Sequence, residues 1–332
     1  MTLPADVHFV AALEQLQPTQ AVRLATEARR AGFAGTMVFD RFQPWLPSQG
    51  QAPSVWTVAG AMASGDSGLI TVSAVPGYRM HPAATAQASA TLASLAEDGH
   101  RLLLSAGDAI DEHIAGGYWP EAPDRASRLF EAADMIRRLF SASAKGNDTR
   151  HAGEHYRLET SRLWTLPETA PAIHIWAGGP VTARRAGRSG LGIVVQAAAR
   201  DRLAAILHAF DEGRRESGSS AKAVAHVQLS WAPTDDDAMH QALEHWPMAG
   251  LRFPRGDIRS PFDVAQLAHS VTTDDIRTRI PVHSDASAHA RHIRSFLDMG
   301  FASVQVHNVG RNHEEWLEAF EDKIAPELQA RS

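Results

Sequence analysis

The chain has 332 residues, a formal net charge of −6 and no cysteine, so disulfide bonds, thiolate metal sites and cysteine nucleophiles are excluded. Its hydrophobic fraction of 44% is normal for a globular protein, and no run approaches the roughly 20 apolar residues that cross a bilayer. Because the acidic excess is mixed with many arginines along the chain, neither a nucleic-acid footprint nor a membrane partner is expected.

The first predicted elements form a β-α-β unit. Strands are predicted at 7–12 and 35–39, and residues 18–31 between them carry apolar side chains at helical spacing. The pattern then recurs, with a strand at 69–73, a helix at 82–96, a strand at 101–104 and a long helix at 125–141. Parallel strands joined by crossover helices are therefore expected.

The second half continues the same alternation after a polar, turn-rich stretch at 142–171, which predicts a loop or a hairpin. Later strands are predicted at 172–176, 192–195, 224–231 and 303–307, and helices at 181–188, 202–217, 235–245, 287–299 and 314–326. Eight strands predict an α/β fold, a TIM-like (β/α)8 barrel that spans residues 1–332 as a single domain. Residues 246–281 have little clean periodicity and predict an insertion, or lid, over the C-terminal face of the barrel.

Two motifs at predicted strand ends point to a site. Asp40, Arg41 and Trp45 follow the strand at 35–39, and a carboxylate, a guanidinium and an indole at one strand end indicate a place where α/β enzymes assemble their chemistry. The turn Ala177-Gly178-Gly179-Pro180 follows a strand and opens a helix, so its N–H groups can approach an anion without a Cβ in the way. An ordinary tight turn is the alternative for that motif.

Several motifs, taken in order, resemble those of the luciferase-like superfamily, in the branch of the coenzyme F420-dependent glucose-6-phosphate dehydrogenases. They are Glu14-Gln15, the segment from Asp40 to Trp45, Arg79-Met80-His81-Pro82 and Ala177-Gly178-Gly179-Pro180. The resemblance covers nearly the whole chain. The segment 306–312 is similar to a subgroup that has been thought to use an ordinary flavin, so the resemblance implies FMN or coenzyme F420 as cofactor, a small-molecule substrate and a homodimer.

The resemblance also implies roles for individual residues. Catalysis or ring positioning is expected of Asp40, Arg41, Trp45 and Asp108; cofactor binding of Asp40, Ser73, Ala74, Asp111, Ala177, Gly178, Gly179 and Gln196; and substrate contact of Glu14, Trp45 and His307. A non-proline cis peptide is implied between Ser73 and Ala74. Acidic residues near a helix start are also explained by the helix dipole, and a histidine at a strand end is as often structural.

The chain departs from the sugar-phosphate dehydrogenases at three places. Arg41 stands where they have a histidine base, and arginine cannot accept a proton near neutrality. Asp108 stands where they have a glutamate that donates a proton, and the stretch 196–200 lacks their phosphate-binding lysine. Glucose 6-phosphate is therefore not expected as substrate. An ion pair of Arg41 with Asp40 or Asp108 that only orders the loop is the structural alternative for Arg41.

Three functions from different classes remain open at this point. The first is a flavin- or deazaflavin-dependent oxidoreductase, and the second is a binding or regulatory protein that kept the fold but lost turnover. The third is a metal-dependent barrel hydrolase, suggested by His283, His289 and His292, although these fall around a predicted helix whose polar face they are expected to occupy. No metal site and no secretory signal are predicted, and the cytoplasm is the default location.

Overall fold

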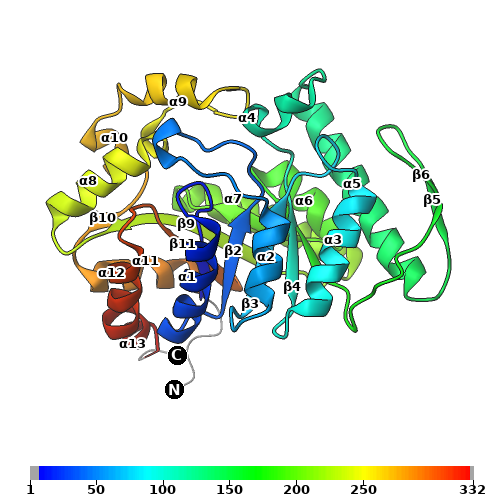
Figure 1. Ribbon diagram of the computed structural model, residues 1–332, viewed down its shortest axis with the longest axis horizontal. Helices are drawn as coiled ribbons and strands as arrows, with labels where there is room; N and C mark the ends of the chain where they lie inside the picture. Colours follow the sequence, from blue (N-terminus) through cyan, green and yellow to red (C-terminus); the bar gives the residue numbers. More distant parts are fainter. Residues whose placement is uncertain (1–6, 330–332) are drawn as a thin grey trace.

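A closed barrel of eight parallel strands dominates the computed structural model, which describes residues 7–329. The barrel order is β1 (Val7–Val10), β2 (Gly35–Phe39), β3 (Leu69–Ala74), β4 (His100–Leu104), β7 (Ala172–Trp176), β8 (Gly192–Gln196), β9 (Ala223–Trp231) and β11 (Ser303–Asn308). Strand β11 pairs with β1 in parallel, which closes the ring. The predicted TIM-like barrel is thus confirmed (Figure 1).

Helices cover the outside of the barrel. They are α1 (Pro18–Ala31), α2 (Val55–Ala63), α3 (Pro82–Leu95), α5 (Ala122–Ser143), α6 (Pro180–Arg188), α7 (Arg200–Ser217), α8 (Asp235–His245), α11 (Ala286–Asp298), α12 (His313–Ala319) and α13 (Ala325–Gln329), whereas the short helix α4 (Ala109–Glu112) lies beyond the end of β4. Helix α1 shows how the sequence sets their limits. Proline occupies its first position, Leu24 and Ala28 are fully buried on its inner face, and it ends at Gly32, whose φ of 108° suits glycine.

The core has an inner and an outer part. Inside the barrel, the side chains of Val10, Met37, Leu103, Val194 and Val224 pack together. Outside it, Phe33 and Phe320 stack with ring centroids 3.7 Å apart, which joins the start of the chain to its last helices. Side chains therefore fill the barrel interior. Room for a ligand is left at the C-terminal ends of the strands, here called the mouth.

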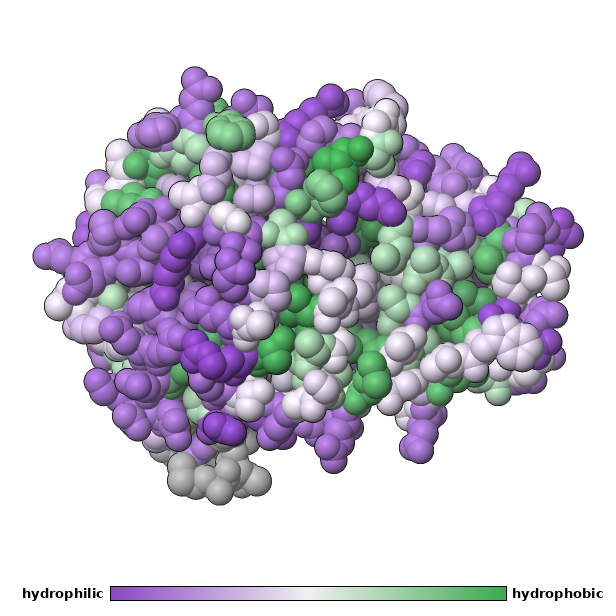
Figure 2. All heavy atoms as spheres, in the orientation of Figure 1, coloured by the Kyte–Doolittle hydropathy of each residue, from purple (hydrophilic) through white to green (hydrophobic). Residues whose placement is uncertain are grey.

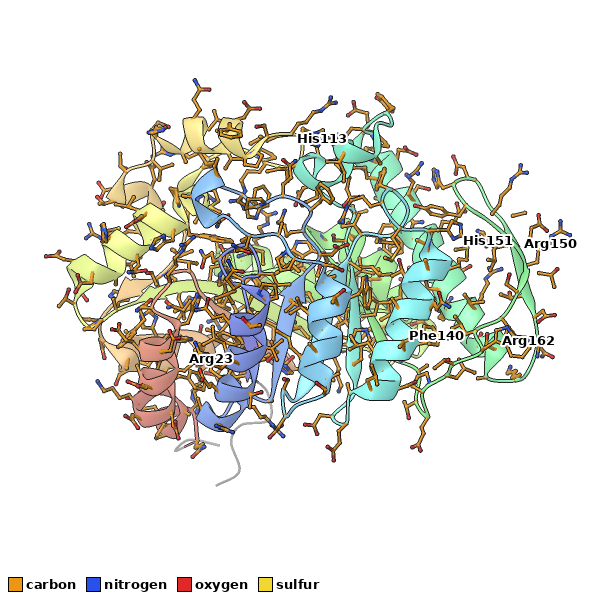
Figure 3. The ribbon with its side chains drawn as sticks, viewed as in Figure 1. Arg23, His113, Phe140, Arg150, His151 and Arg162 are labelled. Atoms are coloured by element: carbon orange, nitrogen blue, oxygen red, sulfur yellow. The ribbon has the colours of Figure 1, made fainter. Side chains whose placement is uncertain are left out.

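The stretch between α5 and β7 forms an antiparallel hairpin of β5 (Thr149–Ala152) and β6 (Arg157–Ser161), as the turn-rich sequence predicted. Figure 3 shows His151 on this hairpin, which extends away from the barrel. Glu131 of α5 holds it, because its Oε1 lies 2.9 Å from His151 Nε2 and accepts from the N–H of Tyr156 at 2.9 Å. The hairpin is thus fixed to α5 and does not cover the mouth of the barrel.

Residues 246–281, here called the lid segment, contain η3 (Pro247–Gly250), α9 (Pro261–Ala268) and α10 (Thr273–Arg277). Figure 1 places α9 and α10 at the end of the barrel toward which β2 points. Apolar side chains of the lid segment pack with Trp45 and Leu46, from the loop after β2, and with Ile110 of α4. The segment is followed by β10 (Val282–His283), which pairs with the end of β9.

The outer surface is mainly polar on the face drawn in Figure 2, where apolar side chains form scattered patches among hydrophilic ones. Within residues 7–329, no helix combines the length and the apolar character that a membrane span needs.

Candidate active site

A cavity of about 500 Å³ lies at the C-terminal ends of the strands, under the lid segment. This volume is in the range of small-molecule sites. Ten residues with a predicted role line it, namely Glu14, Asp40, Arg41, Trp45, Ser73, Asp108, Asp111, Gly178, Gln196 and His307. Three do not: the side chains of Ala74 and Ala177 pack into the core, and Gly179 caps α6.

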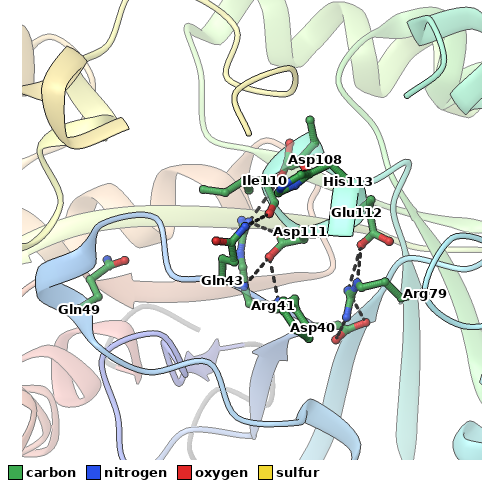
Figure 4. Close-up of polar contacts among 12 residues, drawn as sticks. Asp40, Arg41, Gln43, Gln49, Arg79, Asp108, Ile110, Asp111, Glu112 and His113 are labelled. Atoms are coloured by element: carbon green, nitrogen blue, oxygen red, sulfur yellow. Dashed lines mark hydrogen bonds and ion pairs between the residues drawn. The ribbon is translucent and has the colours of Figure 1, made fainter. Parts of the chain in front are cut away.

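Arg41 lies in the middle of the mouth with only 11% of its side chain exposed. Its Nη1 is 2.6 Å from Asp111 Oδ2 and 3.6 Å from Asp108 Oδ2, and its guanidinium lies 4.0 Å from the ring centroid of Trp45 (Figure 4). The structural alternative for Arg41 was an ion pair with Asp40 or with Asp108, and the pair with Asp108 is present as the longer contact. Asp40 pairs with Arg79 instead.

Asp111 orders the loop that carries Arg41. Its second oxygen, Oδ1, accepts from the backbone N–H of Phe42 at 2.9 Å and of Gln43 at 3.1 Å. The Gln43 side chain in turn donates to the carbonyl of Ile110 at 2.5 Å. Helix α4 therefore holds the loop that follows β2 in place. Asp111 is a positioning residue for Arg41.

Asp40 belongs to a second ionic group that sequence reasoning missed. Arg79 donates to both oxygens of Asp40, at 3.2 and 3.0 Å, and to Glu112 Oε1 at 3.0 Å (Figure 4). Burial raises the pKa of Glu112 to about 7, although Arg79 opposes that shift. The signal that could have found this group is Arg79 itself, which lies just after β3 in a motif that carried the resemblance.

Two further carboxyl groups of the cavity are shifted toward their protonated forms. Burial raises the pKa of Asp108, and the charge of Arg41 only partly opposes this. Burial likewise raises the pKa of Glu14, which is 2% exposed. Glu14 Oε2 has no hydrogen-bond partner among residues 7–329. The mouth therefore holds two carboxyl groups whose pKa values are raised, and one of them, Asp108, is also paired with Arg41.

The glycine turn between β7 and α6 has the geometry of an anion site. Gly179 is the N-cap of α6, Pro180 is its first residue, and a Cβ built on Gly178 or Gly179 would meet nothing within 4 Å. Arg202 donates to the carbonyl of Gly178 at 2.8 Å and brings a positive charge to the turn. Open space, first-turn N–H groups and an arginine together fit a phosphate group, such as the one that both FMN and coenzyme F420 carry.

The cis peptide bond that the resemblance implied between Ser73 and Ala74 is not present. No cis peptide bond occurs among residues 7–329, so this bond is trans. The strand is regular there, because Ser73 and Ala74 pair with Leu103 and Leu104 of β4, and the Ala74 carbonyl accepts from the N–H of Ser105 at 3.0 Å. Ser73 still lines the cavity, whereas Ala74 offers it no side chain.

Polar side chains from β9, β11 and the lid segment also line the cavity, and only His307 among them was predicted. His226 and Gln228 of β9 and Trp246 of the lid segment line it together with the predicted His307. The ring centroids of Trp246 and His307 are 4.6 Å apart. Burial lowers the pKa of His226 to about 4 and that of His307 well below its usual range, so both rings are neutral. The alternation of positions 226 and 228 along β9 was the available signal.

The lid segment contacts the site through residues 255–257. The guanidinium of Arg255 lies 5.0 Å from the ring centroid of Trp45, and the carbonyl of Gly256 accepts from the N–H of Ala109 at 2.8 Å. Asp257 Oδ1 accepts from Trp119 Nε1 at 2.9 Å and from Arg125 Nη1 at 3.1 Å. The lid segment is thus tied to α4 and to the start of α5.

The three histidines that suggested a hydrolase lie elsewhere, and one expectation about them is wrong. His289 is fully buried and not on a polar face, because its ring packs near Trp316 and its Nε2 lies 2.9 Å from the carbonyl of His283. Among residues 7–329, no three His, Asp or Glu side chains gather in a way that could hold a metal ion.

Comparison with known proteins agrees with this geometry. Residues 5–323 match the family described as luciferase-like monooxygenase. The F420-dependent glucose-6-phosphate dehydrogenase of Microbacterium testaceum is 28% identical over 100% of this chain and 99% of its own, and that of Nocardia farcinica is 30% identical over 98% of each. An F420-dependent secondary alcohol dehydrogenase, solved in complex with an F420-acetone adduct, superposes with a TM-score of 0.90 at 25% identity, over 99% of this chain and 100% of its own.

Proposed function

The chain belongs to the luciferase-like monooxygenase family, and on that premise we propose that it is an oxidoreductase that reduces a small carbonyl compound with hydride from reduced coenzyme F420. One observation carries the proposal: a single cavity joins an anion-binding glycine turn to a mouth lined by Arg41, Trp45 and two carboxyl groups with raised pKa. The bound ring would supply the hydride, and the protein would supply position and charge.

The choice of coenzyme F420 rests on the relatives named above. In this chain, the N–H groups at Gly178 and Gly179, backed by Arg202, would hold the phosphate. Ser73 of β3 and Gln196 of β8 line the same cavity and would contact the ring. FMN is the second candidate, because segment 306–312 is similar to a subgroup thought to use an ordinary flavin.

The proposed substrate is a carbonyl compound without a phosphate group. No lysine is among the residues that line the cavity, and its walls include Trp45, Trp176 and Trp246. Reduction is the proposed direction because Arg41 cannot take a proton from a hydroxyl group, while a permanent cation stabilises negative charge that develops on a carbonyl oxygen. The acids needed to protonate that oxygen are present.

Purified protein tests the proposal in two steps. Titration with coenzyme F420 and with FMN, followed by fluorescence, should give a dissociation constant in the micromolar range or tighter for one of them. The protein with the reduced cofactor is then mixed with acetone, cyclohexanone and benzaldehyde, and cofactor oxidation is followed by absorbance. Failure to bind either cofactor would reject the proposal. Binding without turnover of any member of the panel would favour the regulatory alternative.

A homodimer is part of the proposal, because the family resemblance suggests one. Size-exclusion chromatography with light scattering would give twice the mass of 36.0 kDa if the pairing occurs.

A further inference from the structure

Glu14 combines burial with an unused hydrogen-bonding atom inside the cavity. It lies four residues beyond the end of β1, is 2% exposed, and lines the cavity. Its Oε2 has no partner among residues 7–329. A buried polar atom without a partner is destabilising, and in Glu14 it belongs to a side chain that lines the cavity. Glu14 is therefore a candidate to interact with a ligand.

The backbone around Glu14 is fixed, so the side chain has a defined position. The Glu14 carbonyl accepts from the N–H of Gln51 at 3.2 Å. The neighbouring Gln15 donates from Nε2 to the carbonyl of Val309 at 3.2 Å, which ties the loop to the end of β11. The carboxyl group is held at the mouth before any ligand enters.

Glu14 also differs from the other acids that line the cavity because it has no ion-pair partner among the described residues. Asp40 is paired with Arg79 at 3.0 Å, Asp111 with Arg41 at 2.6 Å, and Asp108 with Arg41 at 3.6 Å. Among the described residues, Glu14 has no cationic nitrogen within the 4 Å of an ion pair. Burial also raises its pKa, which favours the protonated form of this carboxyl group.

Building on the proposed function, we infer that Glu14 is the catalytic acid that gives its proton to the oxygen of the substrate carbonyl. The bound cofactor would supply the hydride of the new C–H bond and so reduce the carbonyl carbon, while the C=O π pair moves to oxygen. The Glu14 O–H bond breaks as the O–H bond of the alcohol forms. Glu14 is left as a carboxylate, which the nearby charge of Arg41 stabilises until water returns the proton.

This assignment separates the two acids of the mouth by position. Glu14 follows β1, whose neighbour β11 carries His307, while Asp108 follows β4 and has 35% of its side chain exposed. Glu14, His307 and Trp246 all line the cavity, each has a buried polar atom without a partner among the described residues, and the Trp246 and His307 rings are adjacent. A carbonyl substrate would be bound on this side of the mouth.

The test compares the wild type with Glu14→Gln, which keeps the shape but has no acidic proton, and with Glu14→Asp, which keeps the acid. Glu27→Gln, a change at an exposed helix surface, is the matched control. Infrared difference spectra of the unliganded chain at pH 7 should show a protonated carboxyl band that Glu14→Gln removes and Glu27→Gln leaves. With the panel carbonyl that the wild type reduces fastest, Glu14→Gln should lose at least 100-fold in kcat while cofactor affinity changes less than twofold. Glu14→Asp should recover part of the loss.

Two results would overturn the assignment while the proposed function stands: an unchanged carboxyl band in Glu14→Gln, or a loss in kcat below 100-fold in an enzyme that binds cofactor and reduces the panel. An absence of cofactor binding or of turnover in the wild type would instead reject the proposed function, and the assignment with it.

Discussion

Arg41 and Asp111 form a nearly buried ion pair, with 2.6 Å between Nη1 and Oδ2, across 70 residues of sequence. The same aspartate accepts from two backbone N–H groups of the loop after β2. One carboxylate therefore holds both the cation of the mouth and the loop that carries it. The function of Arg41 and the order of this loop cannot be separated by changing Asp111.

Replacing Arg41 by glutamine should destabilise the protein. Asp111 has 4% of its side chain exposed, so loss of its partner leaves a buried charge with only backbone donors. The free energy of unfolding should fall by about 3–5 kcal/mol, measured by urea denaturation. Arg23→Gln is the control, because Arg23 forms ion pairs with 48% of its side chain exposed and should change stability by less than about 1 kcal/mol. Equal effects of the two changes would contradict this account.

Replacing Gly179 by alanine should weaken cofactor binding without weakening the fold. The added Cβ meets nothing within 4 Å, and the φ of −172° is extended backbone that alanine adopts. The melting temperature should stay within a few degrees, while the cofactor dissociation constant rises about tenfold or more, because the methyl group enters the phosphate space.

Gly187→Ala should show the reverse pattern. Its Cβ would lie 2.6 Å from the carbonyl oxygen of Phe210, which is backbone and cannot turn away. The melting temperature of this variant should fall substantially. Unchanged cofactor affinity in Gly179→Ala would place the phosphate elsewhere.

Buried histidines should make the protein sensitive to acid. Burial lowers the pKa of His289 from 6.5 to about 4, so the folded state keeps this ring neutral while the unfolded chain binds a proton. The stabilising contribution is present above pH 6.5 and is lost as the pH falls toward 4. Between pH 7 and pH 5, the free energy of unfolding should therefore fall by about 2 kcal/mol less in His289→Gln than in the wild type. Urea denaturation at each pH measures this difference. His208→Gln, at a site 71% exposed, should follow the wild type.

Asp257→Ala should loosen the lid segment. Asp257 accepts from Trp119 and Arg125, so its removal leaves two donors without this acceptor and frees residues 255–257 from α5. Amide hydrogen exchange of peptides covering 253–258 should accelerate several-fold, with little change in the barrel strands. Asp263→Ala, in α9 of the same segment and without a hydrogen bond to α5, serves as the control. Equal exchange in both variants would show that other contacts hold the lid segment.

The barrel could be predicted because its signals are local. Each strand is a short apolar run, and most helices show helical spacing that begins or ends at proline or glycine, as α1 does. Helix α2 was missed because Val55–Ala63 is apolar on nearly every position and shows no polar face. The regular pairing of Ser73 and Ala74 was also missed, since the resemblance implied a cis bond that these strands do not have.

The pairing of charges inside the mouth could not be predicted. The acids after β2 and β4 were visible, but Asp40 joins Arg79 and Arg41 joins Asp111, and both pairings depend on how neighbouring strands bring loops together. Trp246 was missed for the same reason, because it reaches the cavity from the lid segment and lies next to no strand end in the sequence.

Different strands supply the two sides of the mouth: the glycine turn follows β7, whereas Glu14 follows β1 and His226 and His307 lie in β9 and β11. Because different strands carry the two sides, substitutions in one set of loops can reshape that side of the cavity while the backbone of the other side keeps its own supports.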